Sequence, residues 1–250
     1  MDIIGGGRIG MALERRAAAR GLGCRVWTRD DDVRELADEQ GPILVCTRND
    51  DLDGVVARMP RNRRADLVLT QNGMIRPWLD KQGLATNGRG LIFAAVARRG
   101  DDLTPGGRSP FVGRHADAVV AFFAAIDVPA AHVAAPSFAE IELEKLVWNS
   151  AFGLLCDALH AHVGATLADA RCDALLRELI GVGAAALAID PDVDAMIGRL
   201  RAYSASIPSY RGAVKEWPWR NGFFVDAATA TQLPLPVHAA LVASLPNRPG

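Results

Sequence analysis

A glycine-rich turn at the N-terminus narrows the range of folds more than any other part of the sequence. The first ten residues read MDIIGGGRIG, which places Gly5, Gly7 and Gly10 in the order GxGxxG between a short apolar run and a helical pattern that reaches about Gly21. In a strand–turn–helix unit, the first glycine permits a tight turn, the second lets the backbone approach a pyrophosphate, and the third lets the helix pack closely on the strand. The spacing predicts a dinucleotide site, whose phosphates would face the unpaired N–H groups of the helix N-terminus.

The first 97 residues alternate short apolar runs with helical patterns, which favours this interpretation over a purely structural turn. We expect strands at residues 3–4, 24–27, 43–46, 67–70 and 91–97. Such a rhythm is typical of parallel strands joined by crossover helices. A further helix is expected at 117–126. The stretch at 128–137 is rich in Pro and Ala and has no clear period, so we place the domain boundary there, near Pro136.

The C-terminal part shows helical patterns only. Ser137 and Glu140 stand in the order of a capping box, so the first helix is expected to begin at Ser137 and to end near Leu159. Further helices are expected at 169–189, 196–203, 223–232 and 237–245. The prediction is an α/β fold, in which a Rossmann-like dinucleotide-binding domain with a parallel sheet (1–136) precedes an all-helical substrate and catalytic domain (137–250).

Composition excludes several classes of protein. Half of the 250 residues are apolar and 23% are charged, which argues against disorder, and a net charge of −1 without long blocks of one sign argues against nucleic-acid binding. No stretch offers the ~18 uninterrupted apolar residues of a membrane span, and the motif at Gly5 leaves no room before it for a signal peptide. We therefore expect a cytoplasmic protein that binds neither nucleic acid nor membranes.

The cysteine and histidine patterns predict no metal site. Cys24, Cys46, Cys156 and Cys172 match no metal, redox or disulfide spacing, and we expect reduced, mostly buried thiols. His160 and His162 stand two apart on a predicted helix and cannot form an i,i+4 metal pair. The arginine-rich segment 61–64 is expected to be an exposed loop between a helix and a strand.

The residues after the second predicted strand bear on the choice of cofactor. In dinucleotide-binding folds, an acid at this place binds the ribose 2′-hydroxyl of NAD, whereas a cation accommodates the 2′-phosphate of NADP. Arg29 comes first, and Arg48, after the third strand, can reach the same region, so we favour NADP. The alternatives are that Arg29 is only solvated while residues 30–32 cap the next helix, or that Asp30 binds the ribose.

A second group of polar residues lies in the helical part. Lys145 and Asn149 are four residues apart and share one stripe of a helix, with Gly153 one turn further, where glycine would leave space beside them. Downstream, segment 215–222 (KEWPWRNG) brings a carboxylate and an amide close to two tryptophans: Glu216, Asn221, Trp217 and Trp219. The two tryptophans would either line a pocket or fill the domain interface. Taken alone, Lys145 fits a solvated helix residue equally well.

With these motifs in order, the chain resembles the ketopantoate reductase (2-dehydropantoate 2-reductase) family over nearly its whole length. The matching segments are 5–10 (GGGRIG), Arg29, 71–74 (QNGM), 97–100 (ARRG), 144–146 (EKL) with Asn149, and Glu216 with 221–222. The resemblance implies a dinucleotide-binding domain, a helical domain and a catalytic cleft between them. It also implies that Lys145 is the general acid, that Glu216 assists at the substrate, that Asn149 binds substrate and that Asn72 lies near the nicotinamide.

Departures from the family pattern fall at positions that surround the substrate. Gly153 stands where the family carries a second asparagine, and Pro208 stands where it carries an aspartate, in the run that begins at Ser204. The residues after Glu216 also differ, because Trp-Pro replaces Ile-Asp. The chain is short for the family as well. The reaction type is therefore better supported than ketopantoate as the substrate.

The hypothesis is an NADP-dependent oxidoreductase that uses NADPH to reduce a small 2-oxo acid, as 2-dehydropantoate 2-reductase does in pantothenate biosynthesis. The expected site comprises cofactor residues Gly5, Gly7, Arg8, Ile9, Gly10, Arg29, Arg48 and Asn72, substrate residues Asn149, Asn72 and Ser204, and catalytic residues Lys145 and Glu216. Two alternatives remain open: a reductase of the same architecture that acts on a 3-hydroxyacid or an imine, and an NADP-binding sensor that catalyses nothing. The apolar helical domain leaves homodimerisation open.

Overall fold

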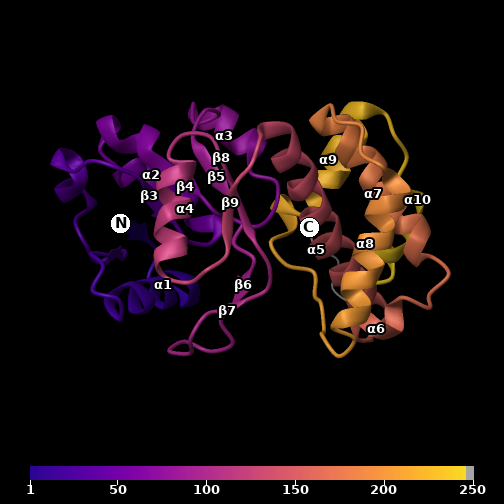
Figure 1. Cartoon of the computed structure of the whole chain (residues 1–250). Helices are drawn as coiled ribbons and strands as arrows, with labels where there is room; N and C mark the ends of the chain where they lie inside the picture. The colour runs from indigo at the N-terminus through magenta and orange to yellow at the C-terminus, as the bar shows by residue number, and fades with distance from the viewer. Residues whose placement is uncertain (246–250) are drawn as a thin grey trace. The chain divides into compact units, whose positions relative to one another are not determined.

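The chain divides into two compact units near the start of a long helix. The computed structural model describes residues 1–245, with one unit at Met1–Phe138 and the other beginning at Ala139. The long helix, α5 (Ala135–Leu159), starts in the first unit and continues into the second (Figure 1). It runs through residue 136 without a break, and the expected division into domains at 1–136 and 137–250 stays a prediction.

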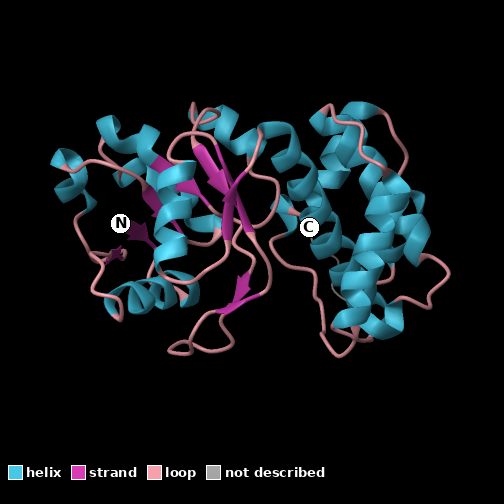
Figure 2. Cartoon of the chain, in the orientation of Figure 1, coloured by secondary structure: helices cyan, strands magenta, loops and turns pink. Residues whose placement is uncertain are grey.

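A seven-stranded sheet forms the centre of the first unit (Figure 2). Its strands, in spatial order, are β2 (Arg25–Trp27), β1 (Asp2–Ile4), β3 (Ile43–Val45), β4 (Leu67–Leu69), β5 (Gly88–Gly90), β8 (Ser109–Val112) and β9 (Ala130–His132). Strands β1 to β5 run parallel, β8 is antiparallel to β5, and β9 is parallel to β8. The strands expected at 3–4, 24–27, 43–46 and 67–70 are confirmed, and so is the fold class.

Helices connect these strands and cover the apolar core. They are α1 (Arg8–Ala18), η1 (Val33–Asp38), η2 (Asn49–Asp51), α2 (Leu52–Arg58), η3 (Arg61–Asp66), α3 (Arg76–Gln82) and α4 (Ala116–Ala125). Leu44 and Val68 of the sheet pack in one core with Phe111 and Phe123, whose rings meet edge to face at 5.0 Å. The chain leaves β1 towards β2 and returns on the other side of β1 as β3. Open α/β sheets bind ligands where strand order reverses in this way, at the carboxyl ends of the strands.

The strand expected at 91–97 is wrong. The sheet strand is β5, three residues earlier, while Ala94–Ala95 (β6) pairs with Thr104–Pro105 (β7) in a separate two-stranded sheet. Strand β5 reads Gly-Arg-Gly because its neighbours leave no room for a side chain at either glycine. A Cβ on Gly88 would lie 2.3 Å from the carbonyl oxygen of Arg114, and one on Gly90 would lie 2.2 Å from the Phe111 ring. Close packing therefore places a strand where the residue types disfavour one.

The segment 128–137 is more regular than expected. It contains the edge strand β9, and α5 begins at Ala135, where the N–H of Phe138 donates to the carbonyl oxygen of Ala134 (2.9 Å). Ser137 therefore lies inside the first turn, and the expected capping box with Glu140 is wrong. Pro136 occupies an early helical position, where the N–H that proline lacks would have no partner within the helix.

The arginine-rich segment 61–64 is not the exposed loop that we expected. It lies in the 3₁₀ helix η3, and Arg63 is only 2% exposed. Its guanidinium donates to the Asp66 carboxylate (2.8 Å) and to the carbonyl oxygens of Leu36 (2.5 Å) and Gly41 (2.9 Å). These bonds satisfy the buried charge and join η1 to η3.

The second unit is helical, as expected. After α5 it comprises α6 (Val163–Thr166), α7 (Cys172–Leu187), α8 (Val193–Ser206), η4 (Trp217–Trp219), α9 (Asn221–Thr231) and α10 (Pro236–Ala243). Helix α7 packs against α8, α9 and α10. At Gly183, a Cβ would lie 2.3 Å from Leu143 Cδ1, which shows how closely α7 approaches α5. His160 and His162 follow the end of α5, so their placement on a helix is wrong.

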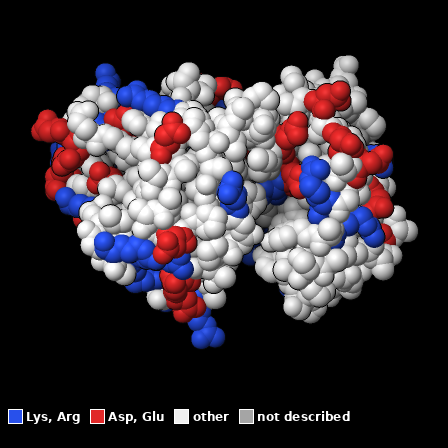
Figure 3. Space-filling model, in the orientation of Figure 1, with Lys and Arg blue, Asp and Glu red and all other residues white. Residues whose placement is uncertain are grey.

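The described part of the chain contains neither a helix long and apolar enough to cross a bilayer nor a group of three or more His, Cys, Asp and Glu side chains placed to bind a metal. All four cysteines are free thiols, two of them buried and two half-buried. On the face shown in Figure 3, acidic and basic side chains are interspersed.

Candidate functional site

The glycine turn has a geometry that only glycine permits. Gly5 has a φ of 119°, and its N–H donates to the carbonyl oxygen of Trp27 (2.9 Å). A Cβ on Gly5 would lie 2.9 Å from the carbonyl oxygen of Cys46, and one on Gly10 would lie 2.2 Å from the carbonyl oxygen of Gly5 itself. Two strands and a helix therefore meet here with backbone against backbone, which leaves the turn free of side chains.

Helix α1 begins at this turn with its first N–H groups open to a ligand. Gly7 is the N-cap residue, and no side chain within residues 1–245 caps it. The Arg8 side chain extends to the carbonyl oxygens of Val96 (3.2 Å) and Ala97 (3.1 Å), and Arg99 donates to the carbonyl oxygen of Gly6 (3.3 Å). Two guanidinium groups thus flank a helix N-terminus, an arrangement that fits a diphosphate. Arg99 belongs to the ARRG segment, and no pattern in the residues around it predicts that it lies beside the turn.

The loops that follow β3 and β4 border the same turn. Thr47 is adjacent to Gly5, and its hydroxyl is buried with no hydrogen-bond partner in the described part of the chain. The Gln71 amide donates to the carbonyl oxygens of Val45 (3.1 Å) and Thr47 (3.2 Å). Asn72 has an exposed side chain, and its backbone carbonyl oxygen accepts a hydrogen bond from the Asn49 side-chain amide (2.8 Å). A buried hydroxyl without a partner beside this turn is a further sign that the turn fits a ligand.

Three arginines lie near the carboxyl ends of β2 and β3. Arg29 and Arg48 are exposed, and Arg48 pairs loosely with Asp50 (3.6 Å). Arg58, which our sequence reasoning missed, donates to the carbonyl oxygen of Arg29 (3.0 Å). A basic residue in the last turn of a helix is common, because it complements the helix dipole, so its position in α2 gave no signal of binding. Asp31 accepts hydrogen bonds from the N–H and hydroxyl of Thr28, which hold its pKa below the usual range.

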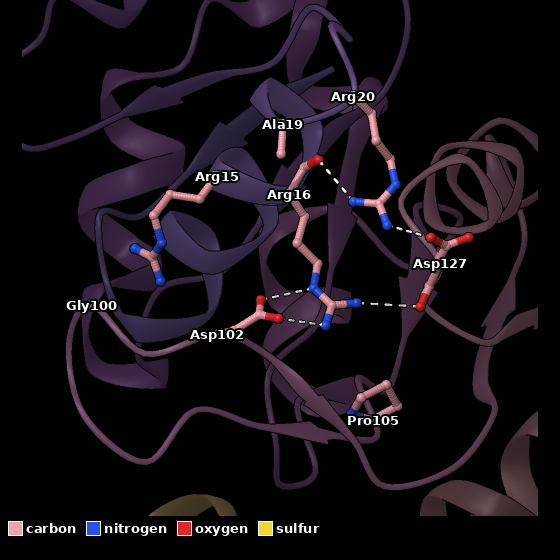
Figure 4. A pocket seen from close by; sticks show the side chains of 8 residues that line it. All are labelled: Arg15, Arg16, Ala19, Arg20, Gly100, Asp102, Pro105 and Asp127. Atoms are coloured by element: carbon pink, nitrogen blue, oxygen red, sulfur yellow. Dashed lines mark hydrogen bonds and ion pairs between the residues drawn. The ribbon is translucent and has the colours of Figure 1, made fainter.

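A second set of arginines clamps α1 to the loop that carries Arg99. Figure 4 shows the Arg16 guanidinium paired with both oxygens of Asp102 (2.8 Å each) and also directed at the carbonyl oxygen of Asp127, with Arg20 paired to the Asp127 carboxylate. These residues line an open cavity of about 600 Å³. The Asp102 and Asp127 carboxylates already neutralise the charges of Arg16 and Arg20. We therefore assign this cluster a structural role: it holds the loop that carries Arg99 against α1.

In the second unit, Lys145 lies half-buried on α5. Burial lowers the pKa of Lys145 to about 7, and the positive charge of Arg220 acts in the same direction. Arg220 donates from Nη2 to Glu216 Oε2 (2.6 Å), and both side chains are largely buried. Glu216 has a φ of 49°, a left-handed conformation that turns the chain into η4. The structure thus joins Glu216 to Arg220 and places Arg220 within electrostatic range of Lys145.

The residues around Lys145 agree with the expectation in one respect and differ from it in another. Asn149 donates from Nδ2 to the carbonyl oxygen of Lys145 (2.9 Å), so the two residues do share one helical stripe. Gly153, however, leaves no open space: a Cβ there would lie 2.7 Å from the carbonyl oxygen of Ala213. A Cβ on Gly212 would lie 2.8 Å from the carbonyl oxygen of Phe152. The two glycines let the 212–213 backbone rest directly on α5.

Two more of the expected residues have bonds that favour structural roles. Ser204 is completely buried, donates to the carbonyl oxygen of Leu200 (2.8 Å) and accepts from Trp148 Nε1 (3.0 Å). Asn221 is buried, and its Oδ1 lies 3.0 Å from His238 Nε2. Burial lowers the pKa of His238 to about 4, so this ring is neutral near pH 7 and donates to the amide oxygen. The role of Ser204 in substrate binding stays a prediction.

The chain is similar in structure to solved dehydrogenases and reductases. The chain matches the ternary structure of D-mandelate dehydrogenase with NADH and anilino(oxo)acetate at a TM-score of 0.74 and 12% identity, covering 98% of this chain and 97% of that one. The 2-dehydropantoate 2-reductase from Methylococcus capsulatus matches at a TM-score of 0.74 and 18% identity, over 96% and 94% of the chains. The probable 2-dehydropantoate 2-reductase from Bacillus subtilis matches at 0.72 and 15%, over 97% and 99%.

At these identities the likeness establishes a shared fold. Neither a protein-family model nor a curated protein sequence matches the chain.

Proposed function

We propose that the chain is an NADP-dependent reductase that acts on a small 2-oxo acid, in the manner of ketopantoate reductase. The observation that carries the proposal is Lys145, a half-buried lysine with a pKa of about 7 beside the Glu216–Arg220 pair. A solvated lysine would keep a pKa near 10.4. Reduction of a carbonyl group needs a proton donor whose pKa lies near neutral pH. A non-catalytic sensor has no use for one.

The residues of the first unit would hold the cofactor. The glycine turn and the start of α1 receive the diphosphate, Arg8 and Arg99 add positive charge to it, and Arg29 with Arg58 receives the 2′-phosphate. When bound, NADPH supplies the hydride that reduces the substrate carbonyl carbon.

The residues of the second unit would act on the substrate. Lys145 donates a proton from Nζ to the carbonyl oxygen as negative charge develops there. Asn149 orients that oxygen through its amide. Glu216 holds Arg220 in place through their 2.6 Å bond, and thereby keeps a positive charge close to Lys145. This charge favours the neutral amine, which helps Lys145 release its proton.

We expect NADPH to bind more tightly than NADH, because arginines at the carboxyl end of β2 can donate charge-assisted hydrogen bonds to the 2′-phosphate. Each such bond contributes roughly 1.5 to 3 kcal/mol. Arg29→Ala should therefore weaken NADPH binding by about 10- to 100-fold and leave NADH binding unchanged. Arg58→Ala should act in the same direction. Calorimetric titration of both cofactors measures this, with Arg177→Ala, which removes an exposed arginine of the second unit, as the control. An Arg29→Ala variant that keeps the full NADPH preference contradicts the assignment.

The rate of reduction should fall as the pH rises through about 7. The ammonium form of Lys145 donates the proton, and with a pKa of about 7 this form prevails below pH 7 and declines tenfold per pH unit above it. Oxidation of the hydroxy acid needs the neutral amine and should rise over the same interval. Profiles of kcat/KM in both directions, from about pH 5 to pH 9, test this, and two parallel profiles would be inconsistent with Lys145 as the proton donor.

The experiment that tests the proposed function is NADPH oxidation across a panel of 2-oxo acids. The panel includes ketopantoate and phenylglyoxylate, the oxidised form of mandelate, together with aliphatic 2-oxo acids of other sizes. An imine and a 3-oxo acid represent the alternative reductases. Turnover of a 2-oxo acid with a kcat/KM well above that of the other classes supports the proposal, whereas cofactor binding without turnover of any compound favours the sensor.

A further inference from the structure

Arg220 is a buried cation whose bonds within the chain leave part of its guanidinium unused. Its side chain is 12% exposed, and Nη2 contacts one oxygen of Glu216. The Nε–H group is buried and has no hydrogen-bond partner among residues 1–245. A guanidinium offers five N–H donors, and a buried donor without a partner carries a desolvation penalty. A ligand with acceptor oxygens would remove that penalty.

A second basic side chain and a helix N-terminus lie near Arg220. Lys145 is within electrostatic range of Arg220, which pairs with Glu216. Arg220 is also the N-cap residue of α9, which within the described residues has no side-chain cap and no acidic residue in its first turn. The positive end of the α9 dipole adds to the same potential. This environment attracts an anion.

We propose that Arg220 binds the carboxylate of the substrate and thereby selects 2-oxo acids over neutral ketones, aldehydes and imines. Arginine suits this task, because its planar fork can pair with both oxygens of a carboxylate. Glu216 anchors one edge of the guanidinium and leaves the rest for the ligand. Lys145 then protonates the adjacent carbonyl oxygen. The assignment rests on the proposed function and narrows its substrate class.

The kinetic test compares an acid with its ester. For the best 2-oxo acid substrate, Arg220→Gln should raise KM by about 10- to 100-fold with a smaller change in kcat, since one charge-assisted pair is lost. For the methyl ester of the same acid, KM should stay within about twofold of the wild-type value. Arg220→Lys, which keeps the charge but loses the fork, should fall between. Lys215→Ala removes an exposed cation from the same segment and should change neither KM.

A binding measurement separates this inference from the proposed function. Oxamate, a non-reacting analogue of a 2-oxo acid, is titrated calorimetrically into the full chain, wild type and variants. We expect binding to the wild type and Lys215→Ala, and at least about tenfold weaker binding to Arg220→Gln. Even if the wild type reduces no 2-oxo acid, this pattern supports the carboxylate site. Equal oxamate affinities in Arg220→Gln and wild type, no binding to the wild type, or equal rises in KM for acid and ester overturn it.

Discussion

Replacing Lys145 with alanine should slow reduction by about 10² to 10⁴, the usual contribution of a positioned general acid, while leaving the affinity for NADPH nearly unchanged. The reason is that Lys145 belongs to the second unit, whereas the glycine turn and the arginines near β2 belong to the first, so the variant loses the proton donor and keeps the cofactor residues. Steady-state turnover at saturating NADPH, together with calorimetric titration of NADPH, measures both quantities.

The lysines of the chain supply controls for this prediction. Lys81 and Lys215 are exposed, and their alanine variants should turn over at the wild-type rate. Lys145→Arg keeps a cation at the site but cannot release a proton near neutral pH, so it should stay as slow as Lys145→Ala. A Lys145→Ala variant with undiminished turnover on its best substrate would remove the enzymatic assignment and favour the NADP-binding sensor.

Much of the fold is encoded in local patterns and was predictable from them. Strands β3 and β4 are short, buried runs of Ile, Leu and Val, and β1 ends in two buried isoleucines. In the glycine motif that follows β1, Gly5 and Gly10 are needed because a Cβ at either position would clash with a backbone carbonyl group. Helix α7 of the second unit also shows apolar periodicity, with one buried face. Periodicity fails at β5, where Gly88 and Gly90 are selected by contacts with Arg114 and Phe111 that lie more than twenty residues further along the chain.

The candidate site, like the fold, was predictable from the sequence only in part. Lys145 and Asn149 could be paired from their spacing alone, because i,i+4 residues of a helix share one face. Arg220 could not be identified, since an arginine four residues after Glu216 has no meaning until η4 turns the chain and brings the two side chains together. Gly153 was misread for a related reason: an absent side chain indicates space only if nothing else fills it, and here the carbonyl group of Ala213 does.

Substituting Gly5 with valine should abolish dinucleotide binding, and Gly10→Ala should weaken it by more than about 100-fold, or ~3 kcal/mol. A side chain on Gly5 combines an unfavourable φ of 119° with contacts of 2.9 Å to the Cys46 carbonyl group. The single methyl group of Gly10→Ala would lie 2.2 Å from the carbonyl oxygen of Gly5, and since that atom is backbone, the turn itself must move. Movement of the turn displaces the N–H groups at the start of α1 from the diphosphate.

Calorimetric titration of NADPH and thermal unfolding, measured on the same samples, distinguish loss of the site from loss of the fold. The matched control is Gly23→Ala, because a Cβ on Gly23 meets nothing within 4 Å. This variant should bind NADPH and unfold as the wild type does. Gly10→Ala should keep a cooperative unfolding transition at a lower Tm, since α1 packs on the sheet through Ala12, Leu13 and Ala17 as well. A folded Gly10→Ala variant with wild-type affinity for NADPH would show that the turn is structural and that the cofactor binds elsewhere.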